Sequence, residues 1–165
     1  MQSFTVTDQA EQRWLETAKL TITGPELQLI EEISSLIDPT PRAVKRFVNV
    51  YLLLKSVGRG RGWPLPERGQ VALLLAIATG LPELADELLP NLAARAEAEP
   101  LTVEAVLPET APGDAAAAQL TRLKAWLGEH PTWRHVALED MDRWSELILR
   151  FRFHRMSAAD SVHTS

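Results

Sequence analysis

Apolar side chains recur along the chain at the three-to-four-residue spacing of α-helices, and this pattern predicts most of the elements. The first clear stripe consists of Leu27, Ile30, Ile33 and Ile37. Thr23 predicts where that helix begins, because its hydroxyl can accept the amide hydrogen of Glu26 while the Glu26 carboxylate reaches back. Pro39 ends the stripe, since a proline disfavours the helical conformation of the residue before it.

A second helix is expected to follow at once and to run to about Ser56. Thr40 suits its N-cap position, and Pro41 suits its first turn, where a missing amide hydrogen costs nothing. The apolar spacing predicts four more helices, at about Glu67 to Thr79, Pro82 to Glu97, Asp114 to Leu127 and Leu138 to Arg150. Gly80 is expected to separate the first two of these into a helical hairpin, and Asp114 is expected to cap the third.

Strand-like alternation is confined to two pieces, residues 21–23 and 151–153, so the sequence predicts an all-α fold. The helices differ in length and composition, which favours an irregular multi-helix bundle over a solenoid. We expect a leader over residues 1–22, one helical domain over residues 23–155 and a flexible tail over residues 156–165. The large apolar residues of the leader are Phe4, Trp14, Leu15 and Leu20, and we expect them to dock onto a larger structure.

The helix that begins near Thr40 differs in character between its two sides. Val44, Phe47, Val48, Tyr51 and the stem of Lys55 project to one side, whereas Arg42, Lys45, Arg46 and Asn49 gather on the other. The cations occupy the first two turns, where the helix dipole and unpaired amide hydrogens favour an anion such as phosphate. Alternatively, Glu31, Glu32 and Asp38 neutralise the cations, or the cations are simply solvated.

Composition places the chain among soluble globular proteins of one domain, with 165 residues, of which 45% are hydrophobic and 24% charged. The formal net charge is -5, but residues 40–68 contain seven basic residues and one acidic residue, so any anion-binding role is expected there. There is no cysteine, no evident secretory signal and no apolar run of membrane-spanning length. We therefore expect a cytoplasmic protein.

The sequence lacks the residues of a nucleotide-hydrolysing core. No Gly-x-x-x-x-Gly-Lys-Ser/Thr loop occurs, so the chain has no amide cradle, phosphate-binding lysine or magnesium-binding hydroxyl of that kind. The histidines are His130, His135, His154 and His163, and their spacing is not that of metal ligands. We therefore expect this chain alone to have no enzymatic activity, no metal and no cofactor.

The tryptophans divide between two interpretations. Trp126, Trp133 and Trp144 have helical spacing and apolar neighbours, which favours a place in the core. Trp63 lies instead in a loop rich in glycine and proline, with Arg59, Arg61 and Arg68 around it. A basic loop with an aromatic residue is the one place where single-stranded nucleic acid is expected to bind, and then only weakly.

The segment Pro-Arg-Ala-Val-Lys-Arg-Phe-Val-Asn, residues 41–49, resembles the Pro-Arg-x-x-Lys-Arg-Phe-x-Asn signature that follows the catalytic core in P-loop NTPases of the KAP family. Leu-Leu-Leu-Lys at residues 52–55, the segment 71–82 and Arg-Phe-Arg-Phe at residues 150–153 also resemble that region, so the likeness covers about Trp14 to Phe153. The resemblance implies the C-terminal helical lid of a bacterial NTPase, without the Walker A and Walker B core.

In related NTPases an arginine early in a lid helix reaches the γ-phosphate, and the resemblance implies this role for Arg46 first and Arg42 second, with Lys45 beside them. ATP and magnesium would then bind only with an NTPase core, on another chain or an upstream segment, which is the expected partner. The alternative function is a stand-alone helical adaptor that docks an acidic protein. Weak nucleic-acid binding through residues 59–68 is the third.

Overall fold

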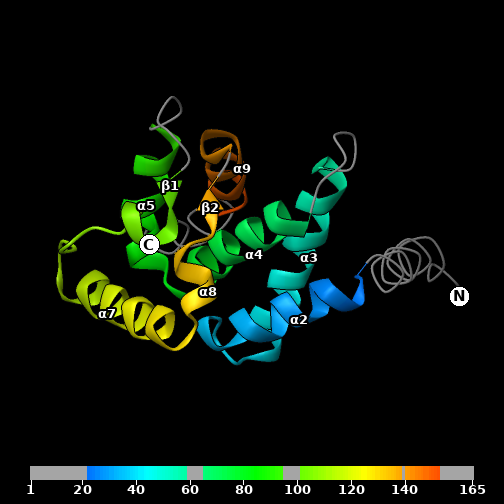
Figure 1. Ribbon diagram of the computed structural model, residues 1–165, viewed down its shortest axis with the longest axis horizontal. Coiled ribbons are helices and arrows are strands. Elements are labelled where there is room, and N and C mark those ends of the chain that lie inside the picture. The colour runs from blue at the N-terminus through cyan, green and yellow to red at the C-terminus, as the bar shows by residue number, and fades with distance from the viewer. Residues whose placement is uncertain (1–21, 59–64, 95–100, 139, 153–165) are drawn as a thin grey trace, which may run out of the picture.

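The computed structural model describes residues 22–58, 65–94, 101–138 and 140–152 (Figure 1). Its elements are α2 (Gly24–Ile33), η1 (Ser34–Leu36), α3 (Pro41–Gly58), α4 (Leu65–Gly80), α5 (Pro82–Ala93), β1 (Leu101–Thr102), α6 (Val103–Val106), α7 (Asp114–Glu129), α8 (Pro131–Arg134), β2 (Ala137–Leu138) and α9 (Met141–Arg152). The predicted all-α class is confirmed for these residues. The leader up to residue 21, the basic loop at residues 59–64 and the tail at residues 156–165 lie outside the described residues.

Helix α4 forms the centre of the fold and crosses the middle of the molecule in Figure 1. Its residues Val71 to Ala78 form an unbroken buried run, as the apolar sequence predicts for a core helix. Helices α2, α3, α5 and α9 all pack against α4, and one hydrophobic core joins residues from α2 to α9. In the described ranges, no helix is both long and apolar enough to cross a membrane.

The predicted starts of α2 and α3 are confirmed by their hydrogen bonds. The hydroxyl of Thr23 accepts the amide hydrogen of Glu26 at 3.4 Å, and the Thr23 amide donates to the Glu26 carboxylate at 2.8 Å. This reciprocal pair is the predicted capping box. The hydroxyl of Thr40 accepts from the amide of Ala43 at 3.3 Å, so Thr40 caps α3.

Two predicted helix starts are wrong. Asp114 does not cap α7, because it is the first helical residue and Gly113 before it, with a φ of 81°, makes the turn without a side-chain cap. The last helix does not begin at Leu138, which pairs with Leu101 in the short antiparallel ribbon of β1 and β2. Helix α9 begins three residues later, at Met141. Strands of two residues are too short to produce an alternating pattern in the sequence.

The corner between α4 and α5 depends on a close approach of two backbones. Helix α4 ends at Gly80, as predicted, and a Cβ atom at this position would lie 1.8 Å from the backbone oxygen of Leu36 in η1. Glycine is therefore needed because η1 touches the end of α4. A positive φ angle is not the reason, since among the described glycines only Gly113 has one.

Two predicted apolar stripes are only partly buried. On α2, Ile33 is buried as expected, but Leu27 is 50% exposed. On α3, Phe47 is buried as expected, but Val44 is 44% exposed. The interior position near the start of α2 is occupied by Glu26, whose exposed fraction is 0%.

Candidate functional site

The basic face of α3, by which we mean Arg42, Lys45 and Arg46, lies in the first two turns of that helix. Arg42 and Lys45 are exposed, and Arg46 is partly buried. The opposite side of the helix is fixed in the core by Phe47 and Tyr51, whose stacked rings have centroids 6.3 Å apart. The helix and its division into a buried side and a basic side agree with the sequence prediction, apart from the exposed Val44.

Arg46 makes a contact that the sequence did not predict. Its Nη2 donates to the backbone oxygen of Phe151 at 3.4 Å, and Phe151 is the next-to-last residue of α9. The last carbonyl groups of a helix have no donor within the helix, and a cation is favoured there by the helix dipole. Arg46 therefore connects the start of α3 to the end of α9.

The described residues supply no carboxylate that neutralises the basic face of α3. The ion pairs found in these ranges do not include Arg42, Lys45 or Arg46. Two of the acids considered as neutralising groups have other roles, because Glu32 accepts from the Trp133 indole at 2.7 Å and Asp38 accepts from the Thr40 amide at 3.1 Å. Within the part of the chain that the structure describes, no ion pair neutralises the positive charge of the basic face.

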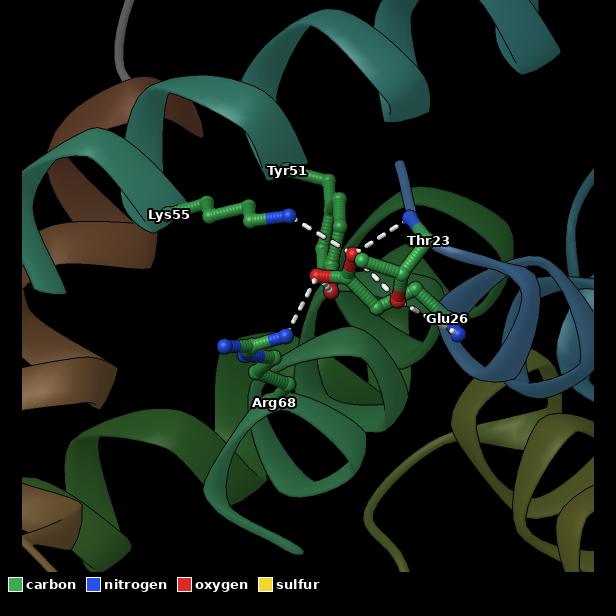
Figure 2. A network of polar contacts seen from close by, with 5 residues as sticks. All are labelled: Thr23, Glu26, Tyr51, Lys55 and Arg68. Atoms are coloured by element: carbon green, nitrogen blue, oxygen red, sulfur yellow. Dashed lines mark hydrogen bonds and ion pairs between the residues drawn. The ribbon is translucent and has the colours of Figure 1, made fainter. Parts of the chain in front are cut away.

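A second polar constellation, which we call the Glu26 cluster, lies between α2, α3 and α4 and consists of Thr23, Glu26, Tyr51, Lys55 and Arg68 (Figure 2). The buried carboxylate of Glu26 is contacted by Lys55 Nζ at 2.6 Å, Thr23 N at 2.8 Å, Tyr51 Oη at 2.9 Å, Thr23 Oγ1 at 3.0 Å and Arg68 Nη1 at 3.5 Å. Lys55 is itself buried, whereas the side chain of Arg68 is partly exposed. One carboxylate thus joins the end of α3 to the start of α4.

The cluster is held in defined protonation states. Burial pushes the pKa of Glu26 upward, but the hydrogen bonds from Lys55, Thr23 and Tyr51 outweigh burial and hold that pKa below its ordinary value. Burial, together with the hydrogen bond to Glu26, raises the pKa of Tyr51. Glu26 therefore stays ionised and Tyr51 stays neutral, and the cluster holds α2, α3 and α4 together through one buried carboxylate.

Sequence reasoning missed the Glu26 cluster, although one signal for it was available. The capping box identified Glu26 as a structural acid, but its burial depends on α3 and α4, which the local pattern does not place. The cluster also changes the meaning of the basic segment. Lys55 and Arg68 were counted toward its positive charge, yet both bind Glu26 and belong to the interior side of the fold.

The remaining candidates from the sequence are the tryptophans, the basic loop and a metal site. Trp126, Trp133 and Trp144 are buried, as expected for packing residues. Trp63, Arg59 and Arg61 lie outside the described residues, so the expected nucleic-acid loop is not placed. In the described ranges, no group of three or more His, Cys, Asp or Glu side chains is arranged to hold a metal ion.

Comparisons with protein-family models, with curated proteins and with solved structures find no significant match to this chain. The basic face and the Glu26 cluster are therefore interpreted from their own geometry and from the sequence.

Proposed function

We propose that this chain is the C-terminal helical, lid-like portion of a P-loop NTPase of the KAP type, and that it acts as a partner or regulatory segment for ATP hydrolysis. In this proposal the chain has no catalytic activity of its own. The NTPase core, on another chain or an upstream segment, supplies the phosphate-binding loop and the magnesium site. The chain supplies cations that approach the nucleotide phosphates from α3.

The observation that supports this proposal is the state of the basic face. Arg42 and Lys45 project from a helix that is anchored in the core by Phe47, and the described residues offer them no acidic partner. Cations in the first turns of a helix oppose its dipole, and an external anion relieves this repulsion. A phosphate presented by another domain is an anion of the required kind.

Arg46 has a distinct place in the proposal. It is the first candidate for sensing phosphate, and it is also the residue that bonds the Phe151 carbonyl. To reach a phosphate with the same nitrogen, Arg46 has to release the end of α9. Nucleotide binding would then be coupled to a movement of α9 relative to α3, which is what a lid requires.

The first test is calorimetric titration of the full chain with magnesium and ATP. We expect no binding in the micromolar range, because the sequence has no phosphate-binding loop. Micromolar binding with turnover by the chain alone would refute the proposal.

The second test adds the chain to a KAP-type NTPase core whose own lid has been removed. We expect hydrolysis to rise, and the rise to fall at least about tenfold with Arg42→Ala or Arg46→Ala, because arginines at a transferred phosphate contribute at least this much. Lys124→Ala is the matched control, since it removes an exposed cation from α7. Equal stimulation by all three variants contradicts a phosphate-sensing role.

An adaptor that docks an acidic protein is the second candidate, and one observation favours it. Leu53 and Val57, on the same side of α3 as Arg42, are 39% and 44% exposed. Exposed apolar residues beside cations are typical of protein-docking surfaces. Leu53→Asp distinguishes the two functions, because it should abolish docking of an acidic protein and leave stimulation of an NTPase core unchanged.

A further inference from the structure

Two exposed helix faces of this protein carry opposite charge. The 18 residues of α3 include no acidic residue, and the 12 residues of α5 include three acidic residues and no basic residue. The exposed side chains on one side of α3 are Arg42, Lys45, Leu53 and Val57, which we call the α3 outer face. Along α5 and its C-cap, the exposed positions on one side include Glu83, Glu87, Pro90 and Ala94, which we call the α5 outer face. The charges make the two faces complementary.

The two outer faces cannot meet within one molecule. Helices α3 and α5 both pack on α4, and Figure 1 shows them on opposite sides of it. Each outer face lies opposite the side that its helix turns to the core, which contains Phe47 and Tyr51 in α3 and Leu88 and Leu89 in α5. A contact between the two outer faces therefore requires a second copy of the chain.

Charged and apolar positions follow one another with the same spacing on both faces. Arg42 precedes Leu53 by as many residues as Glu83 precedes Ala94, and this separation is about 16 Å along a helix axis. When the two helices run parallel, the cations of α3 face the carboxylates of α5, and the apolar halves face each other. In the antiparallel orientation a carboxylate would face Leu53 and lose water without gaining a partner. The spacing therefore favours the parallel contact.

Other occupants fit the α3 outer face less well. A small phosphate can pair with the cations, but it offers nothing apolar to Leu53 and Val57. A second α3 outer face would bring like charges together, which is unfavourable. The α5 outer face carries both carboxylates and apolar residues, in the matching order. Its carboxylates also relieve the repulsion between the α3 dipole and the cations Arg42 and Lys45.

We propose that copies of this chain associate head to tail, with the α3 outer face of one copy against the α5 outer face of the next. Each contact leaves one face of each kind unpaired, so the association can continue into longer assemblies. One pair of helices buries a small area, below about 1,200 Å², so the association is weak. The inference does not rest on the proposed function, since the contact forms without a nucleotide or an NTPase core. A phosphate at Arg42 and Lys45 would compete with it.

The first measurement is sedimentation equilibrium of the full-length protein over a range of protein concentrations. We expect the average mass to rise above that of the monomer as the concentration increases through the micromolar range. The apparent dissociation constant should rise at least about tenfold between about 0.01 M and about 1 M salt, because the screening length then falls from about 30 Å to about 3 Å. A parent that is monomeric at every concentration in low salt overturns the proposal.

Reversing the charge of each face gives the specific test. The variant Arg42→Glu, Lys45→Glu and the variant Glu83→Lys, Glu87→Lys should each be monomeric, because the two outer faces of each variant then have the same sign. An equal mixture of the two variants should associate again, because every contact between unlike copies pairs opposite charges. Each reversal changes the charge by two, so the formal net charge of -5 becomes -9 in the first variant and -1 in the second. Attraction between net charges therefore cannot explain the recovery.

Two controls separate the contact from other effects of the substitutions. Glu104→Lys with Glu129→Lys makes the same change of net charge at exposed positions outside both outer faces, and should leave the association in place. Circular dichroism during heating shows whether each variant is folded. If loss of the Glu83 side-chain hydrogen bond disturbs folding, the single reversals Lys45→Glu and Glu87→Lys repeat the exchange without it.

Three further outcomes overturn the proposal. One is a mixture of folded, reversed variants that stays monomeric. Another is association that is abolished by the reversal on α3 but not by the reversal on α5, because α3 then contacts a different surface. The last is a monomeric parent that binds polyglutamate through Arg42 and Lys45, since the α3 outer face would then serve a different acidic protein.

Discussion

Replacing Glu26 with glutamine should be one of the most damaging single-atom exchanges in this protein. The substitution keeps the size of the side chain and one acceptor oxygen, and it removes the negative charge. That oxygen can accept from Thr23 or from Tyr51 but not from both, because the two bind different carboxylate oxygens of Glu26. Lys55, which is buried, then loses the counter-charge of Glu26, and so does Arg68. The expected damage is therefore electrostatic and separable from packing.

The magnitude follows from the burial of the pair. Removing one partner of a buried ion pair costs about 3–5 kcal/mol, and we expect the lower end because glutamine retains hydrogen bonds and Arg68 is partly exposed. In a protein of this size, about 3 kcal/mol lowers the melting temperature by about 6–12 °C. Circular dichroism during heating and urea unfolding measure both quantities on the full-length chain.

Two further variants test the reasoning. Glu31→Gln, an exposed exchange on the same helix, should change the free energy of unfolding by less than about 0.5 kcal/mol. Lys55→Met added to Glu26→Gln should recover part of the loss, since a buried ion pair is often replaced by apolar groups at little cost. Two outcomes would show that Glu26 and Lys55 are not electrostatically coupled. One is a melting temperature of Glu26→Gln equal to that of the parent, and the other is a loss of stability in the double variant equal to the sum of the losses in Glu26→Gln and in Lys55→Met alone.

Three other predictions rest on separate features. The pKa of Glu26 is lowered in the folded protein, so the ionised carboxylate stabilises the fold fully above the ordinary pKa of 4.5, and this stabilisation is lost as the pH falls below that value. The melting temperature of the parent should therefore fall in acid more steeply than that of Glu26→Gln. Gly80→Ala should lower the free energy of unfolding by about 3 kcal/mol, because the added Cβ clashes with Leu36. Gly128→Ala, at an exposed position within α7, should raise it by about 0.5–1 kcal/mol. Equal melting temperatures for the two variants would contradict this. Phe47→Asp should prevent folding, and Arg46→Ala should cost only about 0.5–1.5 kcal/mol for the bond to Phe151, as urea unfolding will show.

Helix positions were predictable where a local cause determines them. The capping box at Thr23, the proline start of α3 and the apolar run of α4 depend on neighbours in sequence, and all three appear as expected. The ribbon of β1 and β2 was not predictable, because its strands have two residues each and pair residues far apart in the chain, Leu101 with Leu138 and Thr102 with Ala137. The pairing is non-local, so no pattern within either strand indicates its partner.

The burial of Glu26 escaped prediction for a similar reason. A glutamate near a helix start is ordinarily a solvated capping residue. For Glu26, three partners from α3 and α4 offset the cost of burying the carboxylate, and these partners are distant in the sequence. The same partners explain why Leu27, one residue later, is displaced outward. The helical spacing of residues along the sequence assigns each residue to a face of its helix, but it does not show which face the other helices cover.

The basic residues of the segment 40–68 therefore have different roles, and the functional test can separate these roles. Lys55 and Arg68 neutralise Glu26, and Arg46 binds the end of α9. Among the described cations of this segment, Arg42 and Lys45 are therefore the exposed ones. If α3 senses phosphate, Arg42→Ala should weaken stimulation of an NTPase core without altering stability. Arg46→Ala should change both, because its guanidinium also holds α9 in place.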